Sequence, residues 1–266
     1  MSIVRIVAAM AKKDFRTAVS YRVGFITGVI SAFWGLFAFH FVSRLVNSGQ
    51  FSNNSNSYFR YAVVGLLFVS ILQPTAAGTA VSARSEQVQG TLEYLASQPI
   101  RRICVGLGWS AYGFIQSIVI AAVVLALTIP LGFAVSNVNV PVVIGVTLLS
   151  ILIFAAAGNL GAALVLLVQQ GVPLVAGILS IIVILSGTLF PVTEFPTWLQ
   201  FVAHLSPLTY ALEALRSALL ADQPATSYTT DMLVLVGFAI VLVPLSAIVL
   251  EGTFRVAQRR GTLSTF

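Results

Sequence analysis

ICVGLGWSAYGFIQSIVIAAVVLALTIPLGFAVSNVNVPVVIGVTLLSILIFAAAGNLGAALVLLVQQGVPLVAGILSIIVILSGTLFPVT, residues 103–193, contains no Asp, Glu, Lys or Arg. Such a stretch is long enough for three helices of about 20 residues, the length that crosses the hydrocarbon core of a bilayer. Two breaks divide it, SNVNVP at 136–141 and QQGVP at 169–173, and each joins polar side chains to a proline that ends a helix. The stretch therefore predicts three membrane-spanning helices joined by tight turns.

The composition of the whole chain agrees with that prediction. Of 266 residues, 58% are apolar and 8% are charged, whereas about 25% are charged in an average soluble domain. We therefore predict an all-α integral membrane protein with a single transmembrane domain over residues 1–266, which excludes a soluble enzyme. Its six predicted transmembrane helices cover roughly residues 23–42, 61–83, 103–131, 142–168, 174–190 and 232–250.

Residues 1–22 precede the first long apolar run and have a pattern of their own. Ile3, Ile6 and Met10 fall on one side of a helix, and Arg5 lies on the other. The apolar run begins only after Arg22, which does not fit a cleaved signal peptide. We expect an amphipathic N-terminal helix that lies along the membrane surface.

The basic residues indicate the orientation, since short cytoplasmic loops of membrane proteins are enriched in Lys and Arg. Eleven of the 14 lie before residue 23, in the loop after the second predicted span, or after residue 250. The opposite side has Arg44, Arg60 and Arg216. We expect a multi-pass protein of the cell (plasma or inner) membrane with both termini in the cytoplasm. The basic residues form no stripe with stacking aromatics, so nucleic acid is not an expected partner. Membrane lipid is an expected partner.

The predicted cytoplasmic loop, residues 84–102, is the first of two segments that differ from a plain spanning helix. If residues 85–96 form one helix, its apolar face consists of Val88, Leu92 and Leu95. Almost opposite lie Glu86, Gly90 and Glu93. The apolar face could dock into a cytoplasmic partner or back on the bundle, where the helix would only cap it. The glycine would allow a close backbone approach. The expected contact residues are Glu86, Val88, Gly90, Thr91, Leu92, Glu93, Leu95 and Pro99.

The second segment, residues 191–220, is too polar and too rich in proline to cross the bilayer as one helix. Pro196 and Pro207 suit the first turns of two short helices, and Ser206 is a suitable cap for the second. We expect an extracellular re-entrant pair that dips into the outer leaflet and is buried against protein. Glu213 and Arg216 are three positions apart and could pair on the second helix. The expected gate residues are Gly187, Phe190, Pro191, Pro196, Trp198, Pro207, Tyr210, Glu213 and Arg216.

Taken together, these segments resemble the permeases of type-2 ABC exporters. The loop from Glu86 to Pro99, with GTLE at 90–93, is similar to the coupling helix of that family, and residues 186–210 are similar to its re-entrant region between spans five and six. The resemblance implies a dimer of two copies, or of one copy and a related permease. Each permease would rest its coupling helix on a separate ABC ATPase, which binds ATP and Mg. It also implies export of a drug, antibiotic, lipid or lipid-linked glycan.

The residues agree with a transport subunit that is not itself an enzyme. The sequence has no G-x-x-x-x-G-K-[ST] motif, and Lys12 and Lys13 have no glycine-rich loop before them to hold a phosphate. His40 and His204 lie far apart and have no second ligand at helical spacing. We therefore expect no catalytic residue, no metal and no cofactor bound by this chain.

Two alternatives stay open on the sequence. A secondary transporter or channel without an ATPase would be expected to have ionisable side chains within its spans and an inverted internal repeat, and neither pattern is evident. A membrane scaffold that transports nothing would leave the GTLE run at 90–93 without an explanation.

Overall fold

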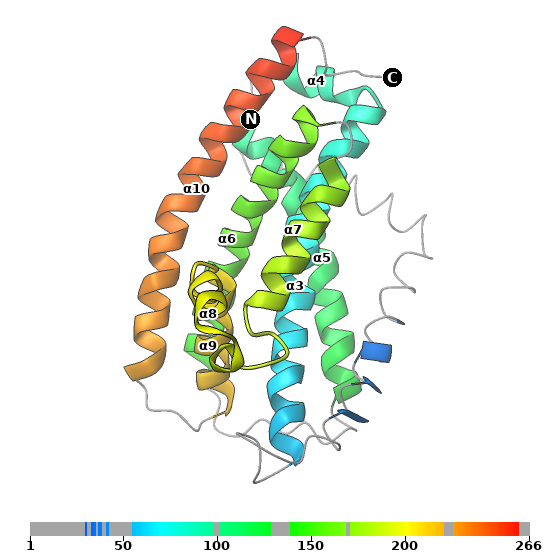
Figure 1. Ribbon diagram of the computed structural model, residues 1–266. Coiled ribbons are helices and arrows are strands. Elements are labelled where there is room, and N and C mark those ends of the chain that lie inside the picture. The colour runs from blue at the N-terminus through cyan, green and yellow to red at the C-terminus, as the bar shows by residue number, and fades with distance from the viewer. Residues whose placement is uncertain are drawn as a thin grey trace.

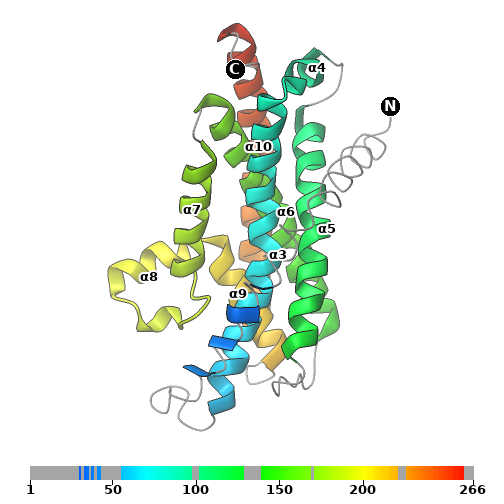
Figure 2. The same cartoon turned by 90° about the vertical axis from the view of Figure 1, so that its right-hand side faces the viewer.

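The computed structural model describes residues 55–97, 102–128, 139–168, 171–220 and 226–260, together with residues 30, 33–35, 37–38 and 41–42. The predicted N-terminal amphipathic helix and most of the first predicted span lie outside the described residues. Within the described part, helices account for the architecture, and the long ones run side by side as a bundle (Figure 1, Figure 2). These long helices are α3 (Ser55–Val88), α5 (Arg102–Thr128), α6 (Val140–Leu167), α7 (Gly171–Leu185) and α10 (Thr226–Arg260).

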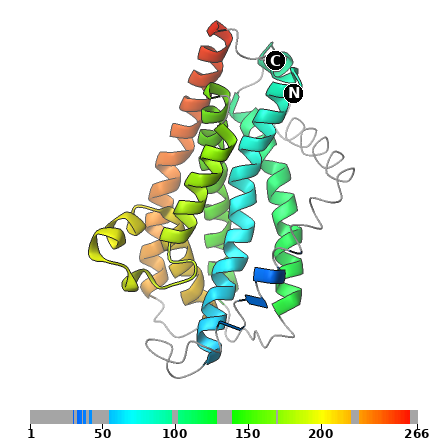
Figure 3. The same cartoon turned by 45° about the vertical axis from the view of Figure 1, so that its right-hand side comes forward.

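Four short elements interrupt or cap the bundle. α4 (Thr91–Ser97) lies at the same end as the last turns of α10 (Figure 1). The 3-10 turn η2 (Val192–Glu194), α8 (Thr197–His204) and α9 (Pro207–Leu220) follow α7. α8 projects from the side of the bundle, nearer the end opposite α4 (Figure 3).

Several helices are long and apolar enough to cross a membrane. Tyr58–Val88, Val140–Leu167 and Tyr228–Arg259 meet both conditions and correspond to the second, fourth and sixth predicted spans. α5, with 27 residues, corresponds to the third. α7 has 15 residues, about 22 Å of helix against a hydrocarbon core of about 30 Å. The protein is thus a helical multi-pass membrane protein, and the total of six spans stays a prediction.

The ends of three predicted spans are wrong. α10 runs from Thr226 to Arg260 rather than from 232 to 250. α3 continues beyond residue 83 to Val88, because backbone hydrogen bonds extend a helix through polar residues that a search for apolar runs leaves out. α7 ends at Leu185 rather than near 190, since the chain turns at Gly187, whose φ of 74° lies in the left-handed region that glycine adopts readily. Pro173, assigned to the preceding break, lies inside the first turn of α7, where a missing N–H is tolerated.

Two clusters of buried apolar side chains hold the bundle together. The larger joins α3, α6, α7, α9 and α10, with Phe68 and Leu212 among its fully buried members. The smaller lies at the α4 end and includes Leu92 and Trp109. Apolar side chains also cover the outer faces of α7 and α10, where Ile240 is 68% exposed. An apolar outer face is what a helix in contact with lipid requires.

Glycines let the three central helices approach closely. A β-carbon on Gly113 of α5 would lie 2.7 Å from the carbonyl oxygen of Pro74 in α3. A β-carbon on Gly158 of α6 would lie 2.7 Å from the hydroxyl of Thr79, also in α3. Thr79 in turn hydrogen-bonds Ser110 of α5 at 2.9 Å between the hydroxyl oxygens. The centre of the bundle therefore packs through small and hydroxyl-bearing residues, as is common between membrane helices.

We expect Gly113→Ala to lower the free energy of unfolding by about 1–3 kcal/mol, because the added methyl group meets backbone that cannot move aside cheaply. Gly237→Ala in α10 is the matched control, since a β-carbon there meets nothing within 4 Å. That control should stay within about 0.5 kcal/mol of the wild type. Thermal unfolding of the purified protein in detergent measures both variants. Equal stability of the two variants would contradict the close packing of α3 and α5.

Candidate functional site

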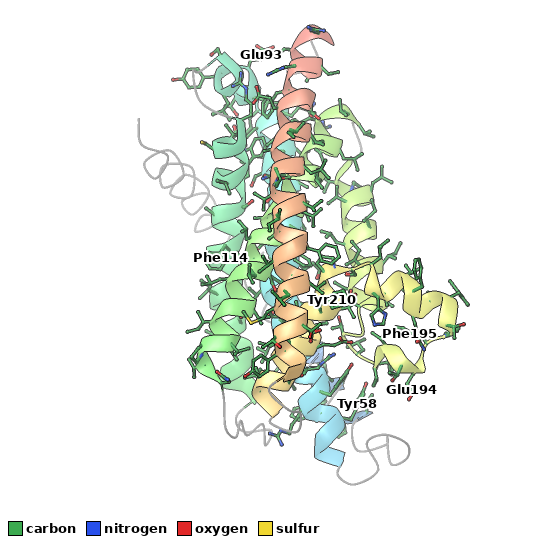
Figure 4. The ribbon with its side chains drawn as sticks, turned by 90° about the vertical axis from the view of Figure 1, so that its left-hand side faces the viewer. Tyr58, Glu93, Phe114, Glu194, Phe195 and Tyr210 are labelled. Carbon is green, nitrogen blue, oxygen red and sulfur yellow. The ribbon has the colours of Figure 1, made fainter. Side chains whose placement is uncertain are left out.

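The two segments predicted to carry function lie towards opposite ends of the bundle. Figure 4 shows Glu93 at one end, and Glu194 and Phe195 towards the other. We call residues 86–97 the α4 loop and residues 186–220 the α8–α9 segment. α3 reaches from one region to the other as a continuous helix.

The α4 loop is not the single helix predicted for residues 85–96. α3 ends at Val88 and α4 begins at Thr91. Between them Gly90 has a φ of 71°, a left-handed conformation that is costly for any residue with a β-carbon. A β-carbon at Gly90 would meet nothing within 4 Å of this chain. The glycine is therefore required by the turn itself, and the close approach of a partner at this position stays a prediction.

The break at Gly90 separates side chains that a continuous helix would align. Val88 is 56% exposed, whereas Leu92 is fully buried and Leu95 is half-buried. Leu92 packs into the smaller core cluster with Trp109 of α5 and Phe254 of α10. The predicted apolar stripe is thus wrong: α4 buries its apolar side chains against its own bundle.

The two acids of the loop also separate. Glu86 is 4% exposed and accepts a hydrogen bond from the hydroxyl of Thr91, which joins the end of α3 to the start of α4. Glu93 and Tyr94 are exposed on the outer side of α4. Pro99 lies outside the described residues. The loop therefore presents an exposed surface with a carboxylate, a phenol and an apolar side chain, formed by Val88, Gly90, Thr91, Glu93 and Tyr94.

Residues that sequence reasoning missed hold α4 in place. Nη1 of Arg102 donates to the carbonyl oxygen of Leu95 at 3.1 Å, and the guanidinium carbon lies 5.4 Å from the ring centroid of Phe254. The rings of Trp109 and Phe254 stack at 6.3 Å between centroids. Nothing local in the sequence relates residue 254 to residue 92. The link arises only because α10 returns to the α4 end of the bundle.

The α8–α9 segment follows its prediction more closely. Pro196 directly precedes α8, and Pro207 begins α9. The amide N–H of Leu208 donates to Oγ of Ser206 at 3.2 Å, so Ser206 caps α9 as predicted. The Ser206 hydroxyl also lies 2.9 Å from that of Ser186, which ties the start of α9 to the end of α7.

α8 is held to the preceding turn by one amide side chain. Nε2 of Gln200 donates to the carbonyl oxygen of Phe195 at 2.7 Å and to that of Thr193 at 3.2 Å. Two large side chains of α8 face outward, with Trp198 68% and Phe201 75% exposed, whereas Ala203 is fully buried. An exposed tryptophan is compatible with the membrane interface, where the position of Trp198 stays a prediction.

The residues expected to form one gate differ widely in burial. Phe190, Pro196 and Trp198 are exposed, whereas Gly187 and Arg216 are buried. The half-buried ones are Pro191, Pro207, Tyr210 and Glu213. The ring of Tyr210 lies 6.2 Å from that of Phe238 in α10 and 6.0 Å from that of His204. The gate residues thus spread from the surface of α8 to the centre of the bundle.

Arg216 does not make the predicted local pair with Glu213. It is 8% exposed, and its Nη1 and Nη2 donate to the carbonyl oxygens of Gly187 at 3.0 Å and Thr188 at 2.8 Å. The guanidinium carbon lies 3.5 Å from the ring centroid of Tyr61 in α3. Burial raises the pKa of the Glu213 carboxyl, on the non-spanning α9.

The candidate site thus consists of two parts, the α4 loop and the α8–α9 segment. Among the described residues, no group of three or more His, Cys, Asp or Glu side chains could hold a metal ion. His204 is exposed, and its Nδ1 lies 2.7 Å from the carbonyl oxygen of Gln200. His40 lies outside the described residues.

Comparison with known proteins gives these features a family. The family described as ABC-2 type transporter matches residues 3–220. The chain is 24% identical over 175 residues to the inner membrane transport permease YadH of Escherichia coli strain K12, covering 65% of this chain and 68% of that protein. The permease of the same name from Shigella flexneri matches with the same identity and coverage. The chain therefore belongs to the ABC-2 type transporter family, as a membrane-spanning permease subunit.

Proposed function

We propose that the chain is the permease subunit of an ATP-driven exporter and is coupled to a separate ATPase through the α4 loop. The observation that carries the proposal is the way α4 is mounted. Its apolar side chain Leu92 is buried in the bundle, which leaves Glu93 and Tyr94 exposed at the tip. A carboxylate beside an aromatic ring, on a helix fixed from behind, is a surface suited to a donor-rich partner.

The mounting of α4 also supports a role in transmitting motion. Leu92 contacts the cluster that contains Phe254 of α10, and Arg102 at the start of α5 holds the carbonyl of Leu95. A push on the exposed face of α4 would therefore reach α5 and α10 through packed side chains. Glu86 and Thr91 add a direct link to α3.

In the proposed orientation the α4 end faces the cytoplasm. The described basic side chains Arg84, Arg102, Arg255 and Arg259 belong to elements that reach this end (Figure 1). Arg60 and Arg216 belong to the parts of α3 and α9 that lie towards the other end. This asymmetry fits the positive-inside rule, and it assigns the α8–α9 segment to the outer side, where it would shape the exit.

The proposed substrate is hydrophobic or amphipathic: a drug, an antibiotic, a lipid or a lipid-linked glycan. Apolar side chains dominate the surfaces of α7, α8 and α10, and exposed aromatic side chains lie on α8. Such surfaces suit a molecule that reaches the protein from the membrane. The ATPase would bind ATP and Mg.

We expect Glu93→Lys to weaken binding of the ATPase roughly 30-fold or more, because reversing a desolvated interfacial charge costs about 2 kcal/mol or more. The measurement is affinity purification of the permease from its native membranes, with the amount of co-purified ABC ATPase and the ATPase activity of the complex as the readouts. Glu194→Lys, an exposed acid on η2, is the matched control and should leave the complex intact. Wild-type assembly and transport by Glu93→Lys would show that α4 only caps the bundle.

The orientation can be tested with single cysteines, because Cys104 is the only native cysteine and is 3% exposed. In a Cys104→Ala background, Thr197→Cys on α8 should react with a membrane-impermeant maleimide in intact cells. Tyr94→Cys on α4 should react only after the cells are permeabilised. The reverse pattern would overturn both the orientation and the outer role of the α8–α9 segment.

We also propose that two permeases work together, since one α4 loop can engage one ATPase and ABC-type ATP sites lie between two. Gly177 on the exposed side of α7 leaves room for a close neighbour, because a β-carbon there meets nothing within 4 Å. Chemical crosslinking in native membranes should yield a species with two permease chains and two ATPases. A complex with one permease and one ATPase would refute the dimer.

A further inference from the structure

We infer that Arg216 is the positioning residue of the α8–α9 segment. Together with Tyr61 and Gly65 of α3, it fixes the turn after α7, at Gly187 and Thr188, against α3. We call these five residues the latch. That this segment shapes an exit rests on the proposed function, whereas the contacts of the latch do not depend on that function.

The carbonyl groups where α7 ends need hydrogen-bond donors from outside the helix. The hydroxyl of Thr188 donates to the carbonyl oxygen of Val183 at 2.8 Å, so a side chain satisfies part of the last helical turn. The carbonyls of Gly187 and Thr188 lie beyond the helix and receive their donors from Arg216 instead. Two neighbouring carbonyls suit the planar fork of a guanidinium, which a lysine ammonium cannot reproduce.

α3 also contacts the turn after α7, through Tyr61. The hydroxyl of Tyr61 donates to the carbonyl oxygen of Gly187 at 2.9 Å, so this oxygen accepts from both Tyr61 and Arg216. The Tyr61 ring lies against the guanidinium, an arrangement in which a cation is attracted to the face of the ring. One tyrosine thus contacts both the turn and the residue that holds it.

Gly65 makes the fit possible. It lies one helical turn after Tyr61 and on the same face of α3. A β-carbon at Gly65 would lie 2.3 Å from the carbonyl oxygen of Thr188 and 2.9 Å from Nη2 of Arg216. Any side chain there would push the turn away from α3. The glycine, the tyrosine and the arginine therefore come from distant parts of the chain and act on one pair of carbonyls.

The latch connects the α8–α9 segment to the helix that also reaches the α4 loop. Tyr61 and Glu86 are both on α3, separated by about 38 Å of continuous helix at 1.5 Å per residue. A displacement of α3 at its α4 end would therefore shift the latch, and with it the turn that leads to η2 and α8. Without the latch, the contacts that remain on α8 include the two Gln200 hydrogen bonds and the hydroxyl of Thr209, which donates to the carbonyl oxygen of Ala203 at 2.6 Å. The Ser186–Ser206 contact would still tie the start of α9 to the end of α7.

The test uses the full-length permease in lipid nanodiscs, with Cys104 replaced by Ala and nitroxide labels on cysteines at Thr197 of α8 and Thr230 of α10, both exposed. Pulsed electron paramagnetic resonance measures the distance distribution between the labels. We expect a narrow distribution for the intact latch. Arg216→Lys, which keeps the charge and loses the fork, and Gly65→Ala, which displaces the turn, should each broaden or shift it. Tyr61→Phe, which removes only the hydroxyl, should have a smaller effect in the same direction.

Two controls separate positioning from general stability. Gly237→Ala adds a β-carbon in open space and should change nothing. Leu250→Ala, fully buried in the cluster at the α4 end, should lower the thermal unfolding temperature and leave the distance distribution narrow. If Arg216→Lys does not fold, Gly65→Ala and Tyr61→Phe carry the test. A narrow, unshifted distribution in the latch variants, or equal broadening in Leu250→Ala, would overturn the inference. Neither ATP nor an ATPase is present, so failure of the latch and failure of the proposed function give different results.

Discussion

Backbone carbonyl and amide groups in apolar surroundings must find hydrogen-bond partners within the protein, because hydrocarbon supplies none. A continuous helix meets this requirement by itself, and a broken one needs help. After α7 the help comes from Arg216, whose guanidinium takes the carbonyls of the turn. At α8 it comes from Gln200, and at α9 from Ser206. This requirement decides where the bundle can be interrupted, and therefore where a part that moves separately can exist.

The packing of the bundle follows from the same solvent. Lipid tails are as apolar as leucine, so helices gain little from burying leucine against leucine and more from close contact between small residues. The interior accordingly contains buried hydroxyl and amide side chains such as Thr79, Ser110 and Asn159. The outer face of α10 instead exposes side chains such as Ile240 and Ile248. The arrangement in a soluble domain would be the reverse.

The family assignment and the geometry of the α4 loop fit one view of how the protein works. α4 is held against the bundle by buried Leu92 and by Arg102, which donates to the carbonyl of Leu95 and lies against Phe254. It can therefore act as a rigid element rather than a flexible loop. α3 extends from α4 to the turn held by Arg216. The α4 loop and the distant α8–α9 segment are thereby joined by one long helix. Neither requires a catalytic group in this chain.

The sequence by itself determined the helical membrane class, the positions of α5 and α6, the presence of a last apolar helix, and the short helices that follow Pro196 and begin at Pro207. Apolar runs, prolines and capping residues act within a few positions of themselves, so they can be recognised without a structure. Only the tertiary structure decided which side chains meet. Arg216 was expected to pair with a residue three positions away, and it instead contacts Gly187 and Tyr61, 29 and 155 positions away. Val88 and Leu92 were expected on one face, and a single left-handed glycine turned them apart. A buried charged side chain must hydrogen-bond to the acceptors that the packing places within reach. A change of φ at one residue alters the direction of the chain, and so the position of every side chain after it.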